Sequence, residues 1–302
     1  MKKLAFVLSA AALGMGITGC KSFAPPMDLE QTARDAETYK TDVKVPVMPR
    51  QKIVIVAKSV MPKGDRVAEA DAYIMDKTES SLAVFFTNLG NIFDTVDRKN
   101  GLTIDSEAIL SGDKNGVDPT KVAGADYVLI AETSYRWQGG MAQAYKFTYN
   151  PQKAVKVYVK TNYRLIATAT KETVVSKEVE SSCEYDRGTG GWQKGVNSCA
   201  SHNAREFARL VSARILPPAK VRQTRGSGWA AQVSMGKNYM AEPGSTVEFL
   251  SYEEDGPISF ARGKVYSADD KNAWVEVTNY EKAGVKKGHF VKLVAEEVVQ
   301  KK

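Results

Sequence analysis

The chain has 302 residues, of which 43% are hydrophobic and 25% charged. This composition excludes a chain without a folded core and leaves room for two domains. The formal net charge is +7. A positive charge of this size can attract nucleic acid, anionic lipid headgroups, cell-wall polymers or an acidic protein, or it can simply keep the protein soluble.

The first twenty-one residues carry the pattern of an export signal. Lys2 and Lys3 precede a short apolar run at 4–13, which is typical of a secretory signal peptide. The run is too short for a membrane-spanning helix, which needs ~20 apolar residues. The sequence Ile-Thr-Gly-Cys at 17–20 resembles a bacterial lipobox, although an ordinary signal peptide with a chance cysteine would also fit.

The lipobox predicts removal of residues 1–19 and lipid attachment at Cys20, through a diacylglycerol and a fatty acyl chain. The mature chain would carry a charge of +5, because the removed segment holds two lysines and no acids. More than one acyl chain makes such an anchor stable. Lys21 stands where an aspartate would favour the inner membrane, so we expect a lipid anchor in the outer membrane, facing the periplasm. Nucleic acid is then not an expected partner.

Residues 20–50 are expected to form the lipidated N-terminus and a flexible tether. They are mainly polar and contain four prolines, which break helices. Fully extended, thirty residues reach at most ~100 Å.

Residues 51–218 read as an α/β domain. The apolar run at 53–57 is typical of a strand covered on both faces, and apolar residues at helical spacing predict a helix from 67 to 89. The rest of the expected order is a strand at 92–96, one or two helices within 103–124, a strand at 126–131, and a hairpin with strands at 155–167 and 173–180. A polar, glycine-rich loop is expected at 181–200, followed by a helix that Ser201 caps and that ends at 217.

The end of the chain changes character. A basic stretch at 219–228 is interpreted as a linker. Residues 229–302 contain short apolar segments separated by glycine, proline and aspartate turns, a pattern that predicts a small barrel. We expect five strands within 229–235, 245–253, 259–267, 272–279 and 289–295.

Several of these segments resemble the curli-assembly CsgG and TolB-N-like lipoprotein family. The most telling pieces are Val-Asp-Arg at 96–98 and Gly-Ala-Asp-Tyr at 124–127, and the likeness covers 50–217. The last domain resembles the small C-terminal barrel of the flagellar protein FlgT over 233–236 and 243–249. The resemblance implies a three-layer-type α/β domain with a mixed sheet and an added antiparallel hairpin, followed by a small SH3-like β-barrel.

For function, the resemblance implies a non-enzymatic scaffold or an assembly or secretion factor of the cell envelope, which works by protein–protein interaction. Two alternatives stay open: a periplasmic activator of a peptidoglycan synthase, as LpoB is, and a subunit of a CsgG-like oligomeric pore. The pore is disfavoured because residues 138–165 could supply membrane strands but 181–200 lack an alternating apolar run. A homo-oligomer is compatible with each reading, and no small-molecule substrate or metal cofactor is expected.

Cys183 and Cys199 remain once Cys20 is lipidated, and an oxidising compartment permits a disulfide between them. A nucleophile–base pair of Cys199 with His202 and a zinc site formed by both cysteines and His202 are the alternatives.

A set of aromatic residues near the hairpin is the candidate partner-binding surface, with packing inside the domain as the alternative. Its members are Trp137, Tyr145, Phe147, Tyr149 and Trp192.

Overall fold

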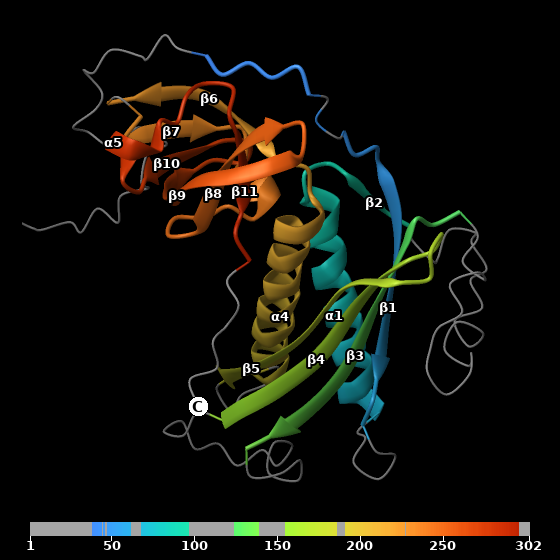
Figure 1. Ribbon diagram of the computed structural model, residues 1–302. Helices are drawn as coiled ribbons and strands as arrows, with labels where there is room; N and C mark the ends of the chain where they lie inside the picture. The colour runs from blue at the N-terminus through green and yellow to red at the C-terminus, as the bar shows by residue number, and fades with distance from the viewer. Residues whose placement is uncertain are drawn as a thin grey trace, which may run out of the picture.

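The computed structural model describes residues 38–43, 45, 47–61, 68–96, 124–138, 155–185, 191–226 and 228–295. Within these ranges the chain forms an α+β fold with an open sheet and a closed barrel (Figure 1), as the sequence predicts. The lipobox, residues 103–123 of the segment expected to hold helices, and residues 139–154 lie outside the described residues.

The open sheet is mixed. Its strands are β1 (Gln51–Ser59), β2 (Phe93–Thr95), β3 (Tyr127–Trp137), β4 (Val155–Ala167) and β5 (Thr173–Tyr185), in the order β2-β1-β3-β4-β5. The strand β1 runs parallel to β2 and β3, whereas β3, β4 and β5 pair antiparallel. The added antiparallel hairpin is thus confirmed, and β5 is the outermost strand of the sheet.

Two helices, α1 (Ala68–Asn88) and α4 (Gly191–Ile215), lie side by side on one face of this sheet (Figure 1). The buried side chains of α1 recur at helical spacing, as the sequence predicts. At the centre of the layer Phe207 of α4 stacks on Tyr163 of β4, with ring centroids 4.8 Å apart, and Phe86 of α1 lies 6.3 Å from Phe207.

The opposite face of the sheet carries its own buried apolar cluster, which includes Val54, Val56, Val128 and Ile130. The strand β1 is therefore buried on both faces, as its continuous apolar run predicts. The helices expected to form a third layer on this side lie outside the described residues.

The start of α4 corrects the expectation of a glycine-rich loop at 181–200. The strand β5 continues to Tyr185, and the helix begins at Gly191, ten residues before the expected cap at Ser201. At Gly195 a side chain would place its Cβ 2.8 Å from a ring carbon of Tyr185 and 3.2 Å from a methyl of Val157. Glycine therefore lets the helix approach the sheet here instead of breaking the helix.

The C-terminal barrel is closed in the order β10-β7-β6-β11-β8-β9. Its elements are β6 (Ala219–Arg225), β7 (Ala230–Val233), the short 3-10 helix η5 (Lys237–Tyr239), β8 (Thr246–Glu253), β9 (Gly256–Ala268), β10 (Ala273–Val277), the short helix α5 (Tyr280–Ala283) and β11 (Phe290–Leu293). The interpretation of 219–228 as a linker was wrong, because β6 pairs with β7 and β11 and completes the barrel.

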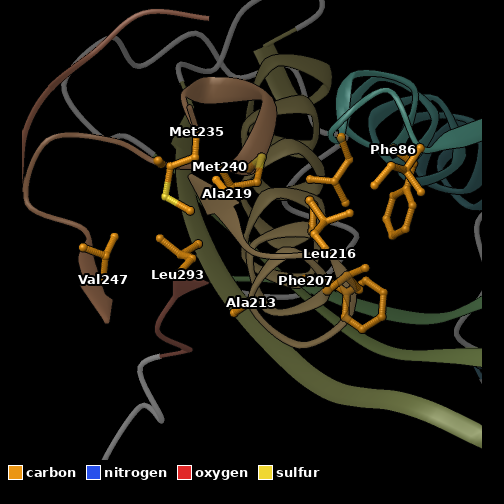
Figure 2. Packing of buried hydrophobic residues seen from close by; sticks show 14 of the residues in the cluster. Phe86, Phe207, Ala213, Leu216, Ala219, Met235, Met240, Val247 and Leu293 are labelled. Atoms are coloured by element: carbon orange, nitrogen blue, oxygen red, sulfur yellow. The ribbon is translucent and has the colours of Figure 1, made fainter. Parts of the chain in front are cut away.

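The α/β domain and the barrel share a continuous hydrophobic core. Figure 2 shows Phe86, Phe207 and Leu216 of the α/β domain in the same cluster as Met235, Met240 and Leu293 of the barrel. The contact also includes two backbone carbonyls of the barrel. The amide of Gly90 donates to Asn238 O at 2.6 Å, and the hydroxyl of Ser212 donates to Tyr239 O at 2.6 Å. The ion pair of Arg205 with Glu242 closes the edge of the contact.

Candidate binding surfaces

The predicted aromatic surface is not an exposed patch in the described residues. Trp137 is only 5% exposed and belongs to a buried cluster with Tyr135, Val157 and Tyr185. Trp192 is half-buried in the first turn of α4, with its ring edge-on to Tyr73 at 5.1 Å. The other three members, Tyr145, Phe147 and Tyr149, lie outside the described residues.

The binding role assigned to Trp137 was therefore wrong, and the strand pattern explains why. Alternate side chains of a strand point to the same face, and Trp137 shares its face of β3 with Leu129 and Ala131, which pack against the helices. The unexpected first turns of α4 cover this end of the sheet. The packing alternative holds for Trp137.

The structure joins Cys183 of β5 and Cys199 of α4 in a disulfide, with their Cα atoms 5.8 Å apart. The bond ties the early turns of α4 to the outermost strand. Both thiols are consumed, so neither the nucleophile pair nor the zinc site is compatible with this structure. In the portion of the chain that the structure describes, no group of three or more potential ligands is arranged to hold a metal ion.

The outer face of β3, β4 and β5 is a ladder of paired charges. Lys160 bonds Glu178 at 2.8 Å, Lys156 bonds Glu184 at 3.1 Å, and Arg136 approaches Glu180 at 3.6 Å. Each pair is largely solvent-exposed, so water screens the attraction between its charges and the pair contributes little to stability. The charges on this face largely neutralise one another, so it offers no single-sign field to a partner.

The segment Thr38–Val43, here called the strap, lies on the barrel although the sequence placed it in the flexible tether. The amide of Tyr39 donates to Lys287 O at 2.7 Å. Its phenol donates to Tyr252 O and accepts from the amide of Tyr252, both at 2.9 Å. At Gly288 an added Cβ would lie 2.4 Å from Tyr39 O, so only glycine allows this approach.

The strap covers His289, for which the sequence predicted no role. The Tyr39 ring lies 4.2 Å from the imidazole on one side and Phe260 lies 4.7 Å from it on another. The imidazole Nδ1 accepts a hydrogen bond from the Lys286 amide at 3.0 Å. Burial, followed by the positive charge of Lys286, lowers the pKa of His289 to about 4.

His289 should make the protein less stable as the pH falls from about 6.5 to about 4. In this window the unfolded chain binds a proton at His289 while the folded chain does not, so unfolding becomes more favourable. We expect a loss of about 1–2 kcal/mol after discounting for solvent screening. Urea unfolding at pH 7.5 and 4.5 measures it. His289→Gln should lose this component of the pH dependence, whereas His202→Gln, an exposed control, should keep it; equal pH dependence in all three would contradict the prediction.

The short helix α5 lies on the side of the barrel away from α1 and α4 (Figure 1), and residues around it line a groove. The groove consists of two cavities, of about 570 and 670 Å³, which share Thr278, Asn279 and Lys282. The half-buried rings of Trp229 and Tyr280 line the first cavity, and that of Phe260 lines the second. No sequence motif marks this groove, because its lining comes from β8, β9, β10, the segment 278–283 that contains α5, and Trp229 before β7.

No protein-family model and no curated protein matches the chain. Among solved structures it is similar to a hypothetical protein from Chlamydia trachomatis (11% identity, 55% of this chain and 95% of that one, TM-score 0.34). It is also similar to a minor lipoprotein from Acinetobacter baumannii (14%, 55% and 96%, TM-score 0.29) and to the PelC dodecamer from Paraburkholderia phytofirmans (12%, 54% and 89%, TM-score 0.28).

At these TM-scores the likeness carries no argument about function, which rests on the residues of this chain. Across the described residues, no helix combines the length and the hydrophobicity needed to cross a bilayer.

Proposed function

We propose that this protein is a non-enzymatic lipoprotein of the cell envelope, anchored in the outer membrane, that acts as a rigid scaffold or assembly factor of the CsgG and TolB-N-like kind. The observation that carries the proposal is the attachment of the strap to a barrel that is itself fused to the α/β domain. An anchor at Cys20 would therefore hold both the barrel and the α/β domain near the membrane, because the two are packed against each other.

The strap determines how far the body can move from an anchor at Cys20. Residue 38 is already fixed on the barrel, so it stands 18 positions after Cys20, a distance along the chain of at most ~60 Å even when fully extended. The flexible tether of thirty residues that the sequence predicts would reach further. A shorter connection supports a role close to the membrane and counts against an activator that must cross the cell wall.

The shared core joins the barrel and the α/β domain into a single body. A domain that moved on a linker would need few contacts with its neighbour, whereas here the buried cluster is continuous and backbone groups bond across it. Partners bound to different surfaces would therefore be held at a fixed separation. This is the property that a scaffold needs and that an enzyme with a single cleft does not.

The proposal is tested by photo-crosslinking in intact cells. A crosslinker replaces Glu180 on the outer sheet face in one strain and Lys271 on the barrel in another, and captured proteins are identified by mass spectrometry. We expect defined envelope proteins, captured from the anchored chain and lost from a Cys20→Ala chain. Capture of a peptidoglycan synthase, or of no protein from either position, would overturn the scaffold proposal.

Cys20→Ala should abolish anchoring, because the lipobox cysteine supplies the thiol that accepts the diacylglycerol. The variant should accumulate as an uncleaved precursor without incorporated palmitate, and it should be absent from the outer-membrane fraction. Metabolic labelling and fractionation measure both effects, with Cys183→Ala as the control that keeps the lipid. A Cys20→Ala chain that is still processed and labelled would show that the anchor is elsewhere.

A further inference from the structure

Among the described residues, the charged groups around the barrel groove form no ion pairs. On the wall formed by β9 and β10, Lys264 stands opposite Glu276, and on β8 and β9 Glu248 stands opposite Arg262. Neither facing pair is joined by an ion pair within the described ranges, nor is Lys282 bonded to a carboxylate there. The outer sheet face, by contrast, joins its facing charges.

The groove therefore offers both signs of charge side by side. The exposed carboxylates of Glu276 and Glu281 line the first cavity together with Lys264 and Lys282. In the second cavity Glu248 lies with Arg262 and Lys282. A nucleic acid or another polyanion would be repelled by the carboxylates. A purely apolar ligand would leave the charges without water or a partner. The complementary ligand is zwitterionic.

Aromatic rings line both cavities beside the charged groups. Trp229, Tyr280 and Phe260 present faces that can lie against the C–H groups of a sugar ring or an alkyl side chain, and each remains half-exposed. Large rigid rings of this kind give contact area at low entropic cost and dominate binding sites. Each of the two cavities has the size of an ordinary ligand site.

We propose that this groove binds peptidoglycan, with the glycan against the aromatic rings and the zwitterionic stem peptide along the charged walls. Carboxylates of the stem peptide would bond Arg262 and Lys282, and the free ammonium of its diamino acid would bond Glu276 and Glu281. The choice of this polymer rests on the proposed envelope location, since peptidoglycan is the zwitterionic glycopeptide of that compartment. The groove lies on the barrel, the domain to which the strap attaches.

Co-sedimentation with purified sacculi tests the proposal. The probe is insoluble peptidoglycan whose stem peptides contain a diamino acid, and the protein is the chain from residue 20 with Cys20→Ser, which keeps it free of lipid. Glu276→Gln with Glu281→Gln should weaken binding about tenfold, because two charge-assisted hydrogen bonds are lost. The matched control, Glu253→Gln with Glu254→Gln in the β8–β9 turn, should bind as the parent does.

The variant with Glu276→Gln and Glu281→Gln distinguishes specific recognition of the stem peptide from electrostatic attraction to an anionic cell wall. If the basic protein merely adheres to an anionic wall, removing two carboxylates from the groove will strengthen binding, and this result would overturn the proposal. Binding that is unchanged after an amidase has removed the stem peptides from the sacculi would also overturn it. So would groove variants that lose a crosslinked protein partner but still bind sacculi, since the groove would then be a protein-docking site.

Circular dichroism of each variant checks that the barrel remains folded, and exposed Glu→Gln changes are expected to leave it so. Because the assay uses lipid-free protein, its outcome does not depend on the anchor. If the Cys20→Ala prediction fails, binding of the protein to sacculi would still support the peptidoglycan proposal. If the protein does not bind sacculi, the scaffold proposal is unaffected.

Discussion

Replacing Phe207 by alanine should lower the free energy of unfolding by about 3–5 kcal/mol, the usual cost of removing a buried phenylalanine. The ring is completely buried, and it stacks against Tyr163 on the sheet and Phe86 on the neighbouring helix. Rigid strands and helices surround the site, so the cavity cannot close easily. Urea unfolding followed by circular dichroism measures the change.

The same experiment tests the shared core. Since Phe207 belongs to a cluster that continues into the barrel, the variant should lose the α/β domain and the barrel in a single transition at a lower urea concentration. Tyr266→Ala, which removes an aromatic ring that is 43% exposed on the barrel, is the control and should shift stability by about 0.5 kcal/mol or less. A barrel that stays folded after the α/β domain has unfolded would show that the two cores are independent.

Removing the disulfide should cost about 3 kcal/mol. The bond closes a loop between residues that are 16 apart in the sequence, and in the chain-entropy model its main effect is to restrict the unfolded chain. The paired change Cys183→Ala with Cys199→Ala should therefore unfold at lower urea than the oxidised parent. Reductant should destabilise the parent but leave the double variant unchanged, which makes the variant its own control.

Mass spectrometry gives an independent measurement of the same bond. The unreduced chain should be lighter by two hydrogen atoms than the reduced chain, and it should resist alkylation at Cys183 and Cys199 after unfolding. Two freely alkylated thiols in the unreduced, unfolded protein would contradict the disulfide. Equal stability of the parent and the double variant would instead show that the bond forms without stabilising the fold.

The pattern of apolar residues along the sequence was enough to predict those strands and helices whose buried residues recur at a regular spacing. The strand β1 reads as a continuous apolar run because both its faces are covered, and α1 carries its buried residues at helical spacing. The alternation in β4 likewise predicted its full length. In these segments local preference and tertiary packing favour the same structure.

The predictions from sequence were wrong where contacts between residues far apart in the chain determine the local structure. Gly195 reads as a helix breaker, and only its approach to Tyr185 explains a glycine inside α4. In β6 the exposed basic residues Lys220 and Arg222 alternate with buried residues. This alternation is the pattern of a strand, but the basic charge favoured the interpretation as a linker. The strap gave no such signal, because Tyr39 is held by backbone groups of residues more than two hundred positions away.

The position of β5 at the edge of the sheet bears on whether two copies of the chain can associate through their strands. Thirteen residues of strand end the sheet on this side, and a long strand edge is a template on which other chains can aggregate. Along it Glu178, Glu180 and Glu184 alternate with small or apolar residues, and the disulfide at Cys183 secures the strand to α4. Charged side chains on an edge strand disfavour the addition of a further strand, and here each of these carboxylates is also held in an ion pair with β3 or β4. The edge of β5 is therefore a poor template for pairing with a second copy of the chain.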